Sequence, residues 1–99
     1  MTKKEYFAIY LPGENDRVSY SSVSEKNNAR VSEIKPFGKY SELYNAGVVK
    51  YVSFMYEKED TLKKFRAELA KNRLSFKKIK GDELYKFDLE GILRNSKSN

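Results

Sequence analysis

Cysteine and histidine are both absent from this chain of 99 residues. Their absence excludes disulfides, thiolate metal sites and the Ser-His and Cys-His pairs of nucleophilic catalysis. It also removes the side chain whose unperturbed pKa suits a general base near neutral pH. Three neighbouring acids, Glu57, Glu59 and Asp60, offer fewer oxygen ligands than a hard cation prefers, and we interpret them as helix-start residues. We therefore expect a non-enzymatic protein without a metal or a cofactor.

Long apolar runs and glycine-rich loops are missing as well. No window approaches the length of apolar sequence that crosses a bilayer, and no apolar segment follows the basic start Met1-Thr2-Lys3-Lys4. The five glycines are isolated, so there is no glycine-rich phosphate loop. These absences predict a cytoplasmic protein with no membrane partner.

The composition itself is typical of a small globular domain, with 39% hydrophobic and 14% aromatic residues. We expect one domain over residues 1–99, with a polar tail that frays from about residue 94.

The clearest pattern runs from strand to helix to strand in the second half of the chain. Residues 48–56 are β-branched or aromatic at both parities, which predicts a central strand buried on both faces. An apolar stripe predicts a helix over about residues 60–73, and Asp60 or Thr61 is placed to cap it. Residues 74–80 predict a second strand. The stripe consists of Leu62, Phe65 and Leu69.

The first half of the chain predicts further strands. Residues 5–11 form an aromatic-rich strand, and Pro, Gly, Asn and Asp in residues 12–16 indicate a turn. Val18 and Tyr20 then alternate with polar residues, which predicts a hairpin with one solvated face. Residues 24–28 are interpreted as a loop.

Two short segments have patterns that indicate their secondary structure less clearly. Val31 and Ile34, three residues apart, suit either a helical turn or a short edge strand. Ser41 is a candidate N-cap for a single helical turn over residues 42–46, and Gly47 suits the left-handed position that ends such a turn.

The chain after residue 80 has two interpretations. Gly81-Asp82 is a two-residue turn signal, and residues 83–90 alternate strictly, so a hairpin with residues 74–80 is favoured. The alternative is a helix that Asp82 caps, which Gly91 weakens.

Together these elements predict an α+β fold. We expect a mainly antiparallel sheet of four or five strands packed against one principal helix at about residues 60–73. The strands on either side of that helix would be parallel if they adjoin.

The positive charge of the chain is concentrated in one segment. Residues 61–80 contain eight bases and a single acid, Glu68, for a net charge of +7, whereas the other 79 residues sum to −1. Local basicity of this kind indicates an anionic partner, because lysine and arginine displace the counterions of phosphates. The candidate binding residues are Lys63, Lys64, Arg66, Lys71, Arg73, Lys77, Lys78 and Lys80.

Tyrosine is abundant, and the tyrosines of the predicted strands have two interpretations. They would form a stacking platform for bases, or they would line the core with their hydroxyls at the surface, which is favoured. The residues concerned are Tyr6, Tyr10, Tyr20, Tyr51, Tyr56 and Tyr85.

Two short stretches resemble the RNA-recognition motif. Tyr51-Val52-Ser53-Phe54 is similar to the second half of that family's longer strand signature, and Ile9-Tyr10-Leu11 to the start of its shorter one. The chain departs from the family because the glycine expected before the aromatic residues is absent, with Val48 and Lys50 in that stretch instead. It also departs because a hairpin rather than a helix is predicted after the first strand. The match covers about seven residues, and the family is not assigned.

Two functions fit these observations. The first is a non-catalytic module that binds DNA or RNA through the basic segment 61–80, with little sequence specificity. The second is a small phage- or mobile-element-type accessory protein that binds and modulates or inhibits a host protein, for example by occupying its nucleic-acid-binding groove.

Overall fold

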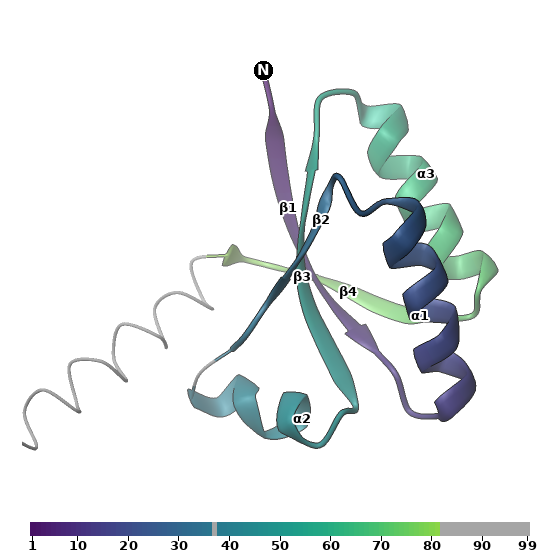
Figure 1. Ribbon diagram of the computed structural model, residues 1–99. Coiled ribbons are helices and arrows are strands. Elements are labelled where there is room, and N and C mark those ends of the chain that lie inside the picture. The colour runs from purple at the N-terminus through teal and green to yellow at the C-terminus, as the bar shows by residue number, and fades with distance from the viewer. Residues whose placement is uncertain (37, 82–99) are drawn as a thin grey trace, which may run out of the picture.

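The computed structural model describes residues 1–36 and 38–81, with only the backbone at position 39. Within that range the chain forms a small α+β domain with a four-stranded sheet, as the sequence predicts (Figure 1). Its elements are β1 (Lys3–Tyr10), α1 (Glu14–Lys26), β2 (Val31–Ile34), the 3-10 turn η1 (Gly38–Tyr40), α2 (Ser41–Asn45), β3 (Val49–Tyr56), α3 (Glu59–Lys71) and β4 (Ser75–Ile79).

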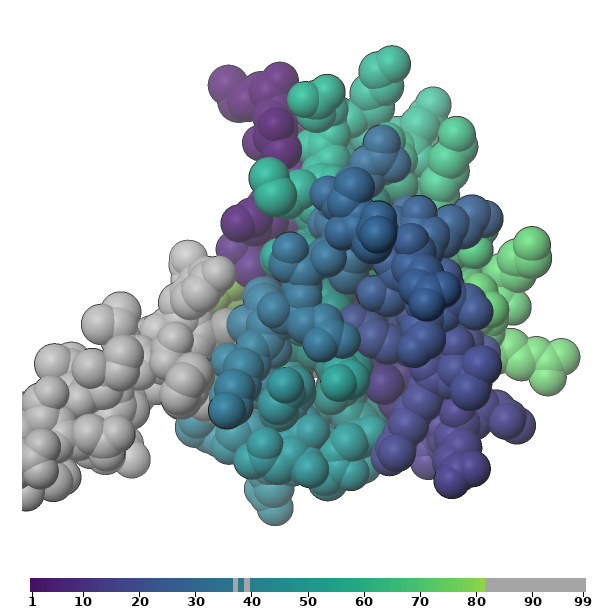
Figure 2. Space-filling model, viewed as in Figure 1, coloured from purple at the N-terminus to yellow at the C-terminus, as the bar shows by residue number. Residues whose placement is uncertain are grey.

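The strands are ordered β2-β3-β1-β4, and every neighbouring pair is antiparallel. α1 and α3 each connect two strands that have a third strand between them, so the chain contains two split βαβ units in a ferredoxin-like arrangement. The strands that flank α3 share the sheet without adjoining, because β1 lies between them. In the space-filling view the N-terminal end of β1 is visible at the surface, and later elements cover most of the remainder of this strand (Figure 2).

One face of the sheet carries the main core. α1 and α3 lie side by side on it (Figure 1), and Leu62, Phe65 and Leu69 of α3 are buried as the apolar stripe predicts. The Phe65 ring stacks on Phe54 at a centroid distance of 4.2 Å and tilts against Phe7 at 5.6 Å. The predicted principal helix is therefore confirmed, but a second helix of the same length shares its face.

The predicted hairpin after the first strand is wrong, because residues Glu14–Lys26 form α1. Tyr20 and Val23, three residues apart, are buried, whereas Val18 is 68% exposed. The alternation of Val18 with Tyr20 therefore does not reflect a strand face. A hairpin partner would also have no place, since β3 and β4 already pair with both edges of β1.

The two ambiguous segments are resolved by their hydrogen bonds. Val31 and Ile34 lie in the edge strand β2, which pairs with β3 alone. Ser41 begins α2 instead of capping it, and its Oγ donates a hydrogen bond to the Gly38 carbonyl. α2 ends at Asn45 with Ala46 as its C-cap, and Gly47 follows in the predicted left-handed conformation with φ of +75°.

α3 differs from the prediction at its ends. Its N-cap is Lys58 and not Asp60 or Thr61, and no side chain caps it by a hydrogen bond. At its C-terminal end Arg73 has φ of +59°, and the amide of Leu74 donates to the Leu69 carbonyl at 3.0 Å. This bond and the left-handed residue form a Schellman ending that usually contains glycine.

Replacing Arg73 with glycine is expected to raise the free energy of unfolding by about 0.5–1 kcal/mol, because glycine adopts a left-handed conformation without a Cβ penalty. Urea denaturation measures the change. Arg73→Ala is the matched control, since it removes the charge and keeps the Cβ. Equal stabilisation by both variants would show that the charge, and not the backbone strain, is the cause.

The residues that the structure describes end at residue 81, just after β4. The predicted turn at Gly81-Asp82, the strand or helix over residues 83–93 and the tail from about residue 94 lie wholly or partly outside the described residues. Within the described part of the chain, no helix is long and apolar enough to cross a membrane.

Candidate functional site

The eight basic residues of segment 61–80 are all exposed, but they do not form one surface. Lys63, Lys64 and Lys71 lie on α3 away from its buried stripe, on the helix side of the sheet. Successive side chains along β4 point to opposite faces of the sheet, which separates its two lysines. Lys77 pairs with Ala8 and faces away from the helices, whereas Lys78 pairs with the core residue Phe7. Arg66 and Arg73 belong to α3 and its C-terminal end, and Lys80 follows β4.

The helix side of the molecule is nearly neutral despite its lysines. α1 carries three acids and two bases, and α3 carries three acids and four bases, so the two helices together have no net charge. The only acid within 61–80, Glu68, lies 2.6 Å from Lys26 of α1. The hydrogen bond from the Lys26 ammonium holds the pKa of Glu68 below its usual value.

Every ion pair within the described range also lies on the helix side. Lys78 is 3.1 Å from Glu5, and both side chains point toward the helices, as do those of Lys50 and Glu33. The cations on this side are therefore largely balanced by acids. The four pairs are Lys3–Glu59, Lys26–Glu68, Lys50–Glu33 and Lys78–Glu5.

The opposite face of the sheet, which we call the tyrosine face, has a different composition. Its strand residues follow from the register, and they include lysines and tyrosines but no acid, arginine, asparagine or glutamine. They are Lys4, Tyr6, Ala8, Tyr10, Ser32, Ile34, Val49, Tyr51, Ser53, Met55, Ser75, Lys77 and Ile79.

A hollow of about 270 Å³ lies in the tyrosine face around Ala8. Tyr51 and Lys77 are the partners of Ala8 on the two neighbouring strands, and Tyr6 and Tyr10 are two residues away along β1. Of these four neighbours, Tyr10, Tyr51 and Lys77 line the hollow, and Ala8, which is only 3% exposed, lies at its floor. The lining residues are Ala8, Tyr10, Tyr40, Tyr51, Lys77, Lys78, Ile79 and Lys80.

The connection between β2 and β3 supplies one wall of this hollow. η1 places Tyr40 over Tyr51, and the two rings meet edge to face at a centroid distance of 5.6 Å. Tyr51 is only 4% exposed, while Tyr10 and Tyr40 are half-buried. Burial raises the pKa of the Tyr51 hydroxyl, and the nearby Tyr10 and Tyr40 raise it further. Tyr51 therefore lies buried at the base of the hollow, and Tyr10 and Tyr40 at its walls keep part of their surface exposed.

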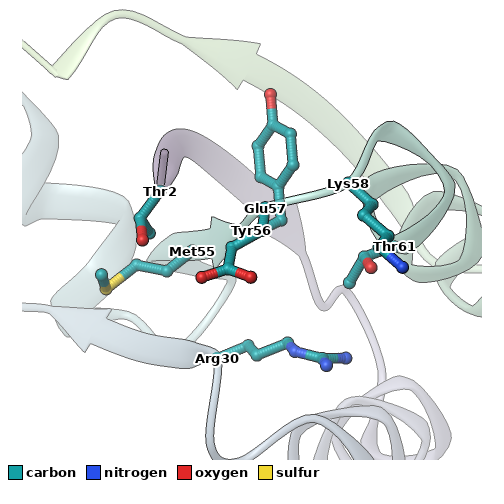
Figure 3. Close-up of a pocket in the computed structure, with 7 residues that line it drawn as sticks. All are labelled: Thr2, Arg30, Met55, Tyr56, Glu57, Lys58 and Thr61. Carbon is teal, nitrogen blue, oxygen red and sulfur yellow. The ribbon is translucent and has the colours of Figure 1, made fainter.

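The other large hollows have mixed charges. One of about 440 Å³ lies where β3 leads into α3, and Figure 3 shows Glu57 in it among Arg30 and Lys58. The first turn of α3 beside it carries Glu59 and Asp60, which oppose an anion at the helix N-terminus. A third hollow, between the start of α1 and the end of α3, contains the acids Glu14 and Asp16. Neither suits a polyanion as well as the tyrosine face does.

The candidate tyrosines divide between the two faces. Tyr20 and Tyr56 are buried on the helix side, in agreement with a core role. Tyr6, Tyr10 and Tyr51 belong to the tyrosine face, together with Tyr40 and Tyr44, which lie outside the predicted strands and are not among the candidates. Tyr85 lies outside the described residues.

Comparison with known proteins identifies no relative: no family model matches the chain, and no significant match exists among curated proteins or solved structures. α1 supplies the helix after the first strand that the RNA-recognition motif has, whereas the missing glycine before Tyr51 remains a departure. In the described ranges, no cluster of three or more acidic side chains is placed to hold a metal ion.

Proposed function

We propose that this protein is a non-catalytic nucleic-acid-binding module that contacts DNA or RNA through its tyrosine face, with little sequence specificity. The observation that carries the proposal is the charge of the two sides. The two helices have no net charge, whereas the strand positions of the tyrosine face hold Lys4 and Lys77 and no acid. Lys80 adds a third cation at the rim of the hollow.

The side chains of this face favour phosphate contact over base-specific readout. Lysine interacts as a flexible point charge, and a row of such charges gains affinity by releasing condensed counterions. Specific readout of base edges relies mainly on arginine, asparagine and glutamine, which the strand positions of the tyrosine face lack. Affinity should therefore fall steeply with salt and change little with sequence.

Charge reversal on the two sides tests the proposal. The sheet variant is Lys4→Glu, Lys77→Glu and Lys80→Glu, and the helix variant is Lys63→Glu, Lys64→Glu and Lys71→Glu. All six side chains are exposed, so neither variant empties the core. Titration of mixed-sequence DNA and RNA at several salt concentrations is expected to show that the sheet variant loses most binding. Its log–log salt slope should shrink by about 0.7–0.9 for each phosphate that the variant no longer neutralises.

The helix variant is the matched control, since it changes the net charge by the same amount. Circular dichroism and thermal melting verify that both variants are folded. Equal loss in both variants would show that overall charge, and not the tyrosine face, determines binding. Failure of the wild-type protein to bind either nucleic acid at low salt would overturn the proposal, and binding to poly-glutamate in that case would indicate an acidic protein surface as the partner.

A further inference from the structure

The geometry points to a single unpaired base as the occupant of the hollow around Ala8, and we infer that the partner is single-stranded nucleic acid. This inference rests on the proposed function and adds to it the form of the nucleic acid. It follows from the shape of the hollow, from the rings that line it and from the positions of the lysines.

The shape of the hollow is set by one small residue in a central strand. Neighbouring strand backbones are about 4.8 Å apart, so Tyr51 and Lys77 lie on opposite sides of Ala8 with their Cα atoms about 10 Å from each other. Along β1, Tyr6 and Tyr10 lie about 13 Å apart with Ala8 midway. The Ala8 side chain ends at Cβ and forms the floor, only 3% exposed, of the hollow of about 270 Å³.

The walls of the hollow are suited to a flat aromatic ligand. Tyr10 and Tyr40 are half-buried and retain exposed surface, while Tyr51 is buried and meets the Tyr40 ring edge to face. Every base has a π-face that stacks on an aromatic side chain, whichever base it is. Tyrosine walls therefore add affinity without adding sequence preference, which agrees with the charges described above.

The size of the hollow argues for one base and not for a complete small ligand. Its volume of about 270 Å³ is below the range of roughly 300–1,000 Å³ that is usual for ligand pockets. The phosphates and sugars attached to the base would remain outside. Lys77 and Lys80, which line the hollow, are positioned to meet them, and neither forms an ion pair with a described residue.

A base in this position must be unpaired. In a duplex the bases are stacked inside the helix, and exposing one requires that it be flipped out at a cost in stacking and pairing energy. A single strand presents its bases freely. The hollow therefore favours a single strand over a duplex of the same sequence.

Three oligonucleotide probes separate the base from the phosphates. They are a mixed-sequence single strand of about ten nucleotides, the duplex of the same sequence, and an abasic strand of the same length. About ten nucleotides is within the usual site size of one domain that binds single strands. The wild-type protein is expected to bind the single strand roughly 5- to 150-fold more tightly than the abasic strand, the range for one stacked base. Equal affinity for the single strand and the abasic strand, or tighter binding of the duplex, would overturn the inference.

Filling the hollow tests its role directly. Ala8→Val adds bulk to the floor and keeps every charge, so it is expected to remove the advantage of the single strand over the abasic strand while binding of the abasic strand stays unchanged. Ala67→Val is the matched control, because it makes the same change on the exposed surface of α3. An unchanged advantage in folded Ala8→Val would exclude the hollow as the base site.

A second pair of variants decides the question if Ala8→Val does not fold. Tyr10→Leu removes a ring from the wall and should reduce the single-strand advantage, whereas Tyr10→Phe keeps the ring and should preserve it. Equal effects of the two would contradict stacking. Failure of the proposed function has a different result, since the wild-type protein would then bind none of the three probes.

Discussion

Replacing Phe65 with alanine is expected to lower the free energy of unfolding by about 3–5 kcal/mol, the usual cost of emptying a phenylalanine site in a core. The side chain is only 1% exposed and lies at the centre of the α3 stripe. It touches the two central strands at once, because its ring stacks on Phe54 of β3 at 4.2 Å and tilts against Phe7 of β1 at 5.6 Å. The cavity would therefore open where the helix meets the sheet.

Urea denaturation with a two-state fit measures this loss. Lys64→Ala is the matched control on the same helix, and it should change stability by less than about 0.5 kcal/mol, because Lys64 is exposed and forms no ion pair with a described residue. Similar losses for the two variants would mean that the helix presents a different side to the sheet from the one described.

Alkaline pH is expected to destabilise the protein through Tyr20. Burial raises the pKa of this phenol well above its ordinary value, and the Glu33 carboxylate, to which its hydroxyl donates a hydrogen bond at 3.0 Å, raises it further. The unfolded chain then loses the proton first, and so binds fewer protons than the folded chain above pH 10. Stability from this group is complete below about pH 10 and falls by about 1.4 kcal/mol for each pH unit above it.

Urea denaturation at a series of pH values from neutral to above pH 10 measures this effect, and the absorbance of tyrosinate follows the ionisation. Tyr20→Phe should be less stable than the wild-type protein at neutral pH by about 1–2 kcal/mol, because it loses the bond to Glu33. It should also lose less stability per pH unit above 10. The burial of Tyr51 and Tyr56 raises their pKa as well, so part of the alkaline slope should remain. An unchanged slope in Tyr20→Phe would contradict the assignment.

The parts of the fold with strong periodicity were predictable from the sequence. Leu62, Phe65 and Leu69 define the buried side of α3, and the doubly apolar run at residues 48–56 marks β3 as a central strand. α1 was missed because its solvated face is rich in serine and its buried residues are few. Tyr20 and Val23 are the only buried residues that α1 contributes, so the helical period is hidden by the alternation of Val18 with Tyr20.

The candidate site was only partly predictable, because a continuous segment of sequence does not remain one surface in a sheet. Lys77 and Lys78 are adjacent in the chain, yet the pleat sends them to opposite faces. Ala8 carries no chemical signal of its own, and its importance follows from its partners Tyr51 and Lys77 on the neighbouring strands. Strand order, which decides those partners, depends on long-range packing that periodicity alone does not report.

The central position of β1 has a consequence for how the protein is made. β1 ends at Tyr10, but its two partners are residues 49–56 and 75–79, so β1 is synthesised before either partner exists. At usual rates of translation, roughly 3–14 s separate the synthesis of Tyr10 from that of Ile79. During this interval Phe7 and Ile9, both fully buried in the finished protein, have no strand to cover them. The nascent chain thus carries an apolar strand without its partner strands for seconds, and chaperones or aggregation would act on it in this state and not in the folded one.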